Sequence, residues 1–261
     1  METIVYLQFF SVAARSEGRI NDIPLIRAHP GEQNTMNIPV RQYLLPGRNV
    51  IELRAQPGGQ PFPDGAEMIL RLAEFTEEDW LEFDEGSEFA AIRPVLTPAT
   101  PVPFIAAATL DLGTEYGRAW AWSQAPVLSE ADHRGALDAY AGQLSDMFAA
   151  RDATGLLAQA MVPLSEDAAA YPRVPLEARQ ANFRQIFDLP PGEEWKPQPF
   201  DPRRIVYRSA AGGRLVELLG ADGLPYLRTW AADPARPFET PGYSELRAFV
   251  GIRDGRFAIL R

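Results

Sequence analysis

Short runs rich in β-branched and aromatic residues, separated by turn-forming residues, fill the first 125 positions of the chain. Such runs are typical of β-strands, and seven of them at this spacing predict an all-β sandwich of the jelly-roll kind. The expected strands are residues 3–12, 19–27, 36–44, 49–56, 66–76, 104–112 and 118–125. The stretch 77–103 is acidic and then Pro-rich, so we expect a surface excursion there with room for one short strand.

Apolar residues at helical spacing replace the strand pattern from residue 129 onward. Ser129 is a favourable N-cap, and Asp132 suits the first turn of a helix. One face of the expected helix consists of Leu137, Tyr140, Ala141, Leu144, Met147 and Phe148. Shorter helices are expected at 155–161 and directly after Pro175. Five strands are then expected at 204–210, 214–220, 224–231, 245–252 and 256–261.

The change of pattern predicts two domains, which suits a chain of 261 residues. Residues 1–127 would form the β-sandwich. Residues 128–261 would form an α+β domain with helices packed on a curved antiparallel sheet.

Two phrases near the N-terminus, "INDIPL" (20–25) and "YLLPGRNVIEL" (43–53), form a turn and a strand that follows a Pro-Gly break. They resemble the accessory β-sandwich of bacterial glycoside hydrolases, which has a galactose-binding-like fold. Asp22 stands where that family usually has Gly. The resemblance covers residues 3–56 and implies a jelly roll, but it does not imply sugar binding.

Residues 129–261 resemble, in element order, the cone-shaped ketosteroid-isomerase-like, nuclear-transport-factor-like and cystatin-like α+β domains. Many such domains bind a small molecule in the cone, and an apolar pocket with a few polar groups is the usual site for one. The candidate ligand-binding residues are Phe183, Trp195, Arg208, Tyr226, Arg228 and Trp230. The alternative is that these aromatic residues form an ordinary core.

The sequence offers little for catalysis. It contains no Cys, which excludes disulfides, thiolate metal sites and Cys nucleophiles. His29 and His133 are the two His residues, and their spacing fits no common zinc motif. A G-x-S-x-G nucleophile motif is also missing. We therefore predict no catalytic residue, no metal site and no cofactor, and favour a protein that is not an enzyme.

The formal net charge is −10, and Lys196 is the single Lys. Nucleic-acid binding is disfavoured because no basic stripe is visible. Residues 74–88 carry eight acidic side chains in fifteen positions, which indicates either a solvated surface or a patch for a basic protein partner. The N-terminus lacks a signal-peptide pattern and no apolar run reaches membrane-spanning length, so a cytoplasmic protein without membrane contact is expected.

These observations favour a non-catalytic interaction or scaffold protein of bacterial type that masks a basic partner. Immunity proteins, which neutralise toxins by covering basic nuclease surfaces, illustrate this class. One alternative is a small-ligand-binding or isomerase/dehydratase-like protein that takes a small apolar ligand into the cone. Another is a glycan-binding module that would need Trp120 or Trp122 exposed on the sandwich. The sequence leaves the partner and the oligomeric state open.

Overall fold

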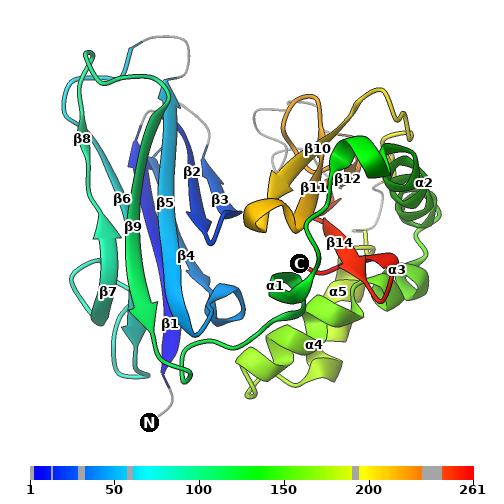
Figure 1. Ribbon diagram of the computed structural model, residues 1–261, viewed down its shortest axis with the longest axis horizontal. Coiled ribbons are helices and arrows are strands. Elements are labelled where there is room, and N and C mark those ends of the chain that lie inside the picture. The colour runs from blue at the N-terminus through cyan, green and yellow to red at the C-terminus, as the bar shows by residue number, and fades with distance from the viewer. Residues whose placement is uncertain (1–2, 13, 29–32, 58–60, 190–193, 231–242) are drawn as a thin grey trace. The chain divides into compact units, whose positions relative to one another are not determined.

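The computed structural model describes residues 3–12, 14–28, 33–57, 61–189, 194–230 and 243–261. The chain divides into two compact units, Met1–Trp120 and Ala121–Arg261 (Figure 1). We call them the N-terminal and C-terminal units. The division falls at residue 121, a few residues before the boundary expected after residue 127. Over the described residues the chain is rich in β-strands and has five α-helices.

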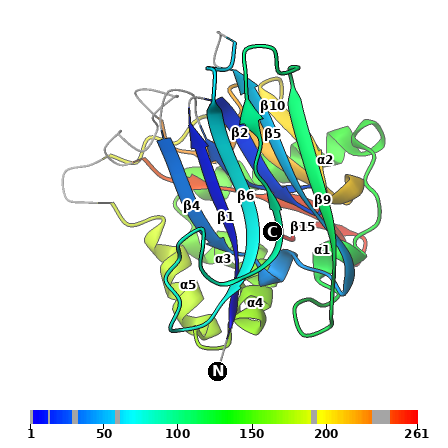
Figure 2. The same cartoon turned by 90° about the vertical axis from the view of Figure 1, so that its left-hand side faces the viewer.

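The N-terminal unit consists of antiparallel strands in two sheets. Its strands are β1 (Ile4–Val12), β2 (Ala14–Ile20), β3 (Ile23–Ala28), β4 (Gln33–Pro39), β5 (Gly47–Pro57), β6 (Ala66–Phe75), β7 (Ser87–Ile92), β8 (Val95–Leu96) and β9 (Phe104–Leu112). One sheet has the order β4-β1-β6-β7, with β8 paired to β6, and the other has the order β3-β2-β5-β9. The two sheets face each other within the unit (Figures 1 and 2).

Alternate residues of the strands enter the space between these sheets. In β5, Ile51 and Leu53 are fully buried while Glu52 and Arg54 point to the other face, as the alternation in the sequence predicts. Each buried Leu or Ile contributes roughly 1.5–3 kcal/mol. The core of the N-terminal unit is therefore built by period-two patterning.

Asn21 and Asp22 form the turn between β2 and β3, so the single strand expected at 19–27 is in fact two strands. Their φ angles are 50° and 63°, the left-handed values that a two-residue hairpin turn needs and that Asn and Asp tolerate. The side chain of Asn21 donates to the Tyr43 carbonyl and to Asn49 Oδ1, both at 2.8 Å. The hairpin is thereby tied to the segment before β5.

Asn49 is fully buried at the start of β5. Its Oδ1 accepts from the Leu45 N–H at 2.8 Å, and its Nδ2 donates to the carbonyls of Leu45 (2.8 Å) and Gly47 (2.9 Å). Gly47 has φ 81°, which permits the sharp turn. The "LLPGRN" phrase is thus a corner closed by one Asn side chain.

The strand expected at 118–125 is absent, which corrects the sequence prediction. Residues Ala121–Gln124 instead form the short helix α1. Trp120 donates from Nε1 to the Leu44 carbonyl at 2.8 Å and is 2% exposed, and Trp122 is 3% exposed. Burial of both indoles speaks against a glycan-binding face built on them.

The C-terminal unit combines helices with two antiparallel sheets. Its helices are α1, α2 (Glu130–Ala149), α3 (Ala153–Gln159), α4 (Met161–Ala170) and α5 (Leu176–Gln185). Its strands are β10 (Ile205–Ala210), β11 (Leu215–Gly220), β12 (Leu227–Arg228), β13 (Glu245–Leu246), β14 (Phe249–Arg253) and β15 (Arg256–Ile259). The sheet orders are β10-β11-β14-β15 and β12-β13.

The long helix α2 follows the sequence prediction. The Ser129 side chain accepts from the Asp132 N–H as an N-cap. The face expected to be apolar lies in the core: Leu137, Ala141, Leu144 and Phe148 are buried, and Tyr140 and Met147 pack against them. Helix α5 begins after Pro175 as expected, whereas the helix expected at 155–161 covers most of α3 and only the first residue of α4.

Several expected boundaries differ from the structure. The stretch 77–103 holds two strands, β7 and β8, rather than one. The strand expected at 224–231 is reduced to β12, and the one expected at 245–252 is split into β13 and β14. His29 and residues 232–242, which lie between the strands expected at 224–231 and 245–252, are outside the described residues.

Candidate functional site

Residues 76–86 connect β6 to β7, and we call them the acidic loop. The loop has six acidic residues and no basic one. Figure 2 shows it crossing the face of the β4-β1-β6-β7 sheet that points away from the core. The contacts between the sheet and the loop backbone determine which side chains of the loop are exposed to solvent.

Arg71 of β6 holds the loop through its main chain. Arg71 as a whole is 2% exposed, and its Nη2 donates to the carbonyls of Glu85 (2.6 Å) and Gly86 (3.3 Å). Nη1 donates to Gln8 Oε1 at 2.6 Å and Nε donates to Glu88 Oε2 at 2.9 Å. The planar guanidinium suits this task because it offers five donors in a fixed arrangement.

Gln8 of β1 is the cross-strand neighbour of Arg71 and completes the anchor. It is fully buried, and its Nε2 donates to the carbonyls of Leu81 (3.1 Å) and Glu82 (3.3 Å). The Phe83 ring packs edge-on against Phe10 at 6.4 Å. Polar and apolar contacts of the sheet therefore both fix the backbone of the loop.

Two carboxylates of the loop are used internally. Asp79 accepts from the Thr76 N–H at 2.5 Å, and Glu85 accepts from the Trp80 N–H at 2.7 Å. Gly86 ends the loop with φ 72°, and a Cβ there would lie 2.7 Å from the Glu74 carbonyl oxygen. Only Gly fits this position without a shift of the backbone.

The remaining side chains of the loop face solvent. The Trp80 indole is 75% exposed and Leu81 is 38% exposed. The carboxylates of Glu78, Glu82 and Asp84 are also exposed. A fixed backbone thus presents a large aromatic side chain among negative charges.

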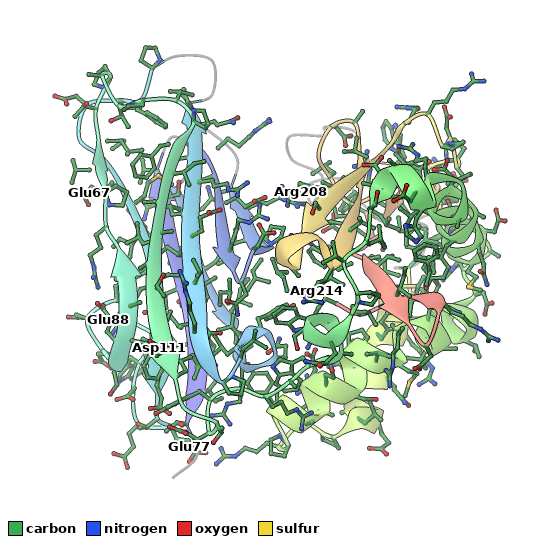
Figure 3. All side chains as sticks on the ribbon, in the orientation of Figure 1. Glu67, Glu77, Glu88, Asp111, Arg208 and Arg214 are labelled. Carbon is green, nitrogen blue, oxygen red and sulfur yellow. The ribbon has the colours of Figure 1, made fainter. Side chains whose placement is uncertain are left out.

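Glu88, at the start of β7 (Figure 3), accepts from Arg71 Nε at 2.9 Å. Hydrogen bonds from Arg93 hold the pKa of this carboxyl below its ordinary value, with a further contribution from Arg71. Glu88 therefore stays ionised at neutral pH and remains a partner for the Arg71 guanidinium.

The six residues expected to bind a ligand take part in several groups of contacts in the C-terminal unit. Phe183 and Trp195 do come together, in an aromatic cluster with Phe148 and Phe187. The ring centroids are 4.8 Å apart for Phe148 and Trp195, and 5.9 Å apart for Phe183 and Phe187. These rings pack on one another as core residues, which is the alternative left open by the sequence.

Tyr226 belongs to the same buried core cluster as Phe183 and packs against Phe200, with centroids 6.0 Å apart. Its hydroxyl accepts from the Asp201 N–H at 2.6 Å, and burial raises its pKa. Trp230 is 54% exposed, at the end of the described segment.

The two Arg residues of the set are held by carboxylates. Arg208 (Figure 3) donates to Glu217 Oε2 from Nε (3.1 Å) and Nη2 (2.8 Å), and Arg247 donates to Glu217 Oε1 at 2.7 Å. Arg228 binds both oxygens of Asp222, at 3.0 and 2.5 Å. Burial acts to raise the pKa of Asp222, but the hydrogen bonds from Arg228 and from the Leu224 N–H, together with the positive charge of Arg228, leave the pKa below its ordinary value. A carboxylate held in this way is a poor general base.

Other titratable side chains of the C-terminal unit are also engaged. Tyr207 donates to Asp138 Oδ1 at 2.7 Å, and burial with this bond raises the Tyr207 pKa. The His133 ring lies 2.9 Å from the Ser129 carbonyl oxygen and edge-on to Phe257. Within the described part of the chain, His, Asp and Glu side chains form no group of three that could hold a metal ion.

Arg71 and Gln8 are the residues of the acidic-loop site that the sequence did not indicate. Both sit in strands whose alternation predicts their face correctly, but their partners are main-chain carbonyls of a distant loop. Carbonyl acceptors leave no signal in a sequence. The signal that could have indicated the anchor is Arg71 itself, a cationic residue within an apolar strand that directly precedes an acidic run.

Comparison of the chain with protein-family models, with curated proteins and with solved structures gave no match. Among the described residues, no helix is both long enough and apolar enough to cross a membrane.

Proposed function

We propose that this protein is a non-catalytic interaction protein that binds a basic protein partner through the acidic loop. The observation that carries the proposal is the anchoring of the loop by the buried Arg71. Its guanidinium binds the loop carbonyls, so the exposed carboxylates and Trp80 are presented on a fixed backbone.

Both kinds of exposed group suit such a partner. Negative charge on one surface accelerates encounter with a positive surface and disfavours acidic partners. Trp is enriched among the residues that dominate binding energy, and an indole can stack on the Arg or Lys side chains of a basic surface. A backbone that is already ordered loses little entropy on binding.

The test measures binding of a fluorescent Arg- and Lys-rich peptide to the full chain by anisotropy. Glu82→Gln with Asp84→Asn removes two exposed charges from the loop. Asp64→Asn with Glu67→Gln is the matched control, since it removes two exposed charges from the same unit outside the loop. Trp80→Ala tests the aromatic contribution.

We expect the loop variant and Trp80→Ala each to weaken binding by about tenfold. The control variant should bind like the natural chain once salt is raised to physiological ionic strength, because distant surface charges are then screened. Equal losses in the loop variant and the control would mean that the peptide senses net charge alone, and would refute the proposal.

We also infer the finer architecture and location. The two facing sheets of the N-terminal unit support a jelly-roll-like sandwich, and the helices with the antiparallel sheet of the C-terminal unit support a cone-like α+β domain. A cytoplasmic location agrees with the absence of Cys. The packed aromatic cluster of the C-terminal unit gives the small-ligand alternative no specific support.

A further inference from the structure

Apart from the two-residue strand β8, the two sheets of the N-terminal unit have four edge strands among the described residues: β3, β4, β7 and β9. An edge strand exposes unpaired backbone groups, so proteins protect it with proline, charge, irregular pairing or short length. Strand β3 carries Pro24 and Arg27, and β4 ends in Pro39. Strand β7 carries Glu88 and pairs with β6 through a register shift.

Strand β9 has none of these protections over most of its length. It spans nine residues, Phe104–Leu112, and its pairing with β5 is regular throughout. It contains no proline, and Asp111 is its one charged residue. Ile105 is 53% exposed, and Ala107 and Thr109 are exposed on the same face. β9 is the outermost strand of its sheet in both views of the ribbon (Figures 1 and 2).

We infer that β9 pairs in solution with β9 of a second copy of this chain, in an antiparallel dimer. Such pairing satisfies the open backbone groups and joins two four-stranded sheets into one continuous sheet.

Two negatively charged copies of the chain repel each other least at this neutral strand. Each chain carries a formal net charge of −10, so two copies repel each other over most of their surfaces. Residues Phe104–Leu110 are neutral, which makes this strand a place of close approach. With the two-fold axis at Ala108, Asp111 of one copy lies opposite Ile105 of the other. No like charges then face each other across the new pair.

The same register allows the proposed dimer to be tested by introducing charged residues that would face each other across the two copies. Ala107 and Thr109 of opposite copies face each other, and both positions are exposed. Ala107→Lys with Thr109→Lys therefore places lysine directly opposite lysine twice in each dimer. Ala107→Lys with Thr109→Glu places lysine opposite glutamate instead. Within one chain Ala107 lies opposite Glu52 and Thr109 opposite Val50, so neither double variant introduces a like-charge pair into the monomer.

Sedimentation equilibrium of the full chain measures the outcome, with circular dichroism as the check on folding. We expect the natural chain to be a dimer and the lysine–lysine variant to dissociate with a dissociation constant at least about tenfold higher. The lysine–glutamate variant should dimerise at least as well as the natural chain. A natural chain that stays monomeric at its highest soluble concentration overturns the inference, as does a dimer that both double variants leave unchanged.

Discussion

Replacing Arg71 with methionine should release the acidic loop from the sheet and destabilise the N-terminal unit. Arg71 makes three short hydrogen bonds, to Gln8 (2.6 Å), Glu85 (2.6 Å) and Glu88 (2.9 Å), and two longer ones to carbonyls of the loop. Bonds from a charged donor contribute roughly 1.5–3 kcal/mol each. The three short bonds alone give an upper bound of about 4.5–9 kcal/mol.

The measured loss will be smaller than this bound, because a detached loop lets the Glu85 and Gly86 carbonyls bond to water. Removing one partner of a buried charged network typically costs about 3–5 kcal/mol, and we expect Arg71→Met to fall in that range. Arg71→Lys is the matched control. It keeps the charge but has one compact ammonium group in place of the planar fork, so we expect a loss of about 2 kcal/mol.

Two assays separate loss of the loop from loss of the fold. Urea denaturation followed by tryptophan fluorescence gives the free energy of unfolding. Hydrogen exchange at the Thr76 and Trp80 amides, which donate to Asp79 and Glu85, reports on the loop itself. If Arg71→Met lowers the free energy of unfolding by less than about 1 kcal/mol and leaves these amides protected, Arg71 is not the anchor.

Three further substitutions test other parts of the structure. Asn49→Ala leaves the half-buried Leu45 N–H and carbonyl without their partner and should cost about 3 kcal/mol in urea denaturation. Asn49→Asp should cost at least as much, because it puts a buried carboxylate oxygen against the Leu45 and Gly47 carbonyls in place of the Nδ2 donor. Gly86→Ala should cost more than Gly65→Ala, because both have φ near 72° but only at Gly86 would a Cβ meet backbone; equal melting-temperature shifts would contradict this. Burial raises the pKa of Asp167 above its ordinary value, so the folded state holds its proton more tightly than the unfolded chain does. Asp167→Asn should therefore stabilise the protein at pH 7, and the gain should shrink as pH falls through the raised pKa; destabilisation at pH 7 would refute this account.

The elements that the sequence predicted well are those whose signal is local. Helix α2 has its cap at Ser129 and its apolar face within one segment, and the structure has both where the sequence indicates them. The residue types at Asn21 and Asp22 indicate a turn, but the division of the expected strand into β2 and β3 depends on the pairing of β2 with β3 and with the distant β5.

The sequence prediction of secondary structure was wrong where a contact with a residue distant in the sequence determines the local structure. The alternation of Ala and Trp at 119–122 suggested a strand, yet Trp120 bonds to the Leu44 carbonyl, and helix α1 begins one residue later. The surroundings of one candidate ligand-binding residue likewise depend on its place in the sheet. Arg208 follows Tyr207 in β10, so the two side chains point to opposite faces of the sheet, and only Tyr207 enters the helix-covered core.

The anchor of the acidic loop has a consequence for how this surface can change over time. The side chains of Arg71 and Gln8 donate hydrogen bonds to backbone carbonyl groups of the loop, and every amino acid has such a group. Substitutions at Glu78, Trp80, Glu82 or Asp84 would leave these hydrogen bonds intact. Gly86 must stay glycine, because a Cβ there would meet the Glu74 carbonyl oxygen. Side chains of the loop can therefore be substituted, by evolution or in a display library, without a change in the backbone conformation of the loop. We expect it to accept grafted recognition sequences of the same length.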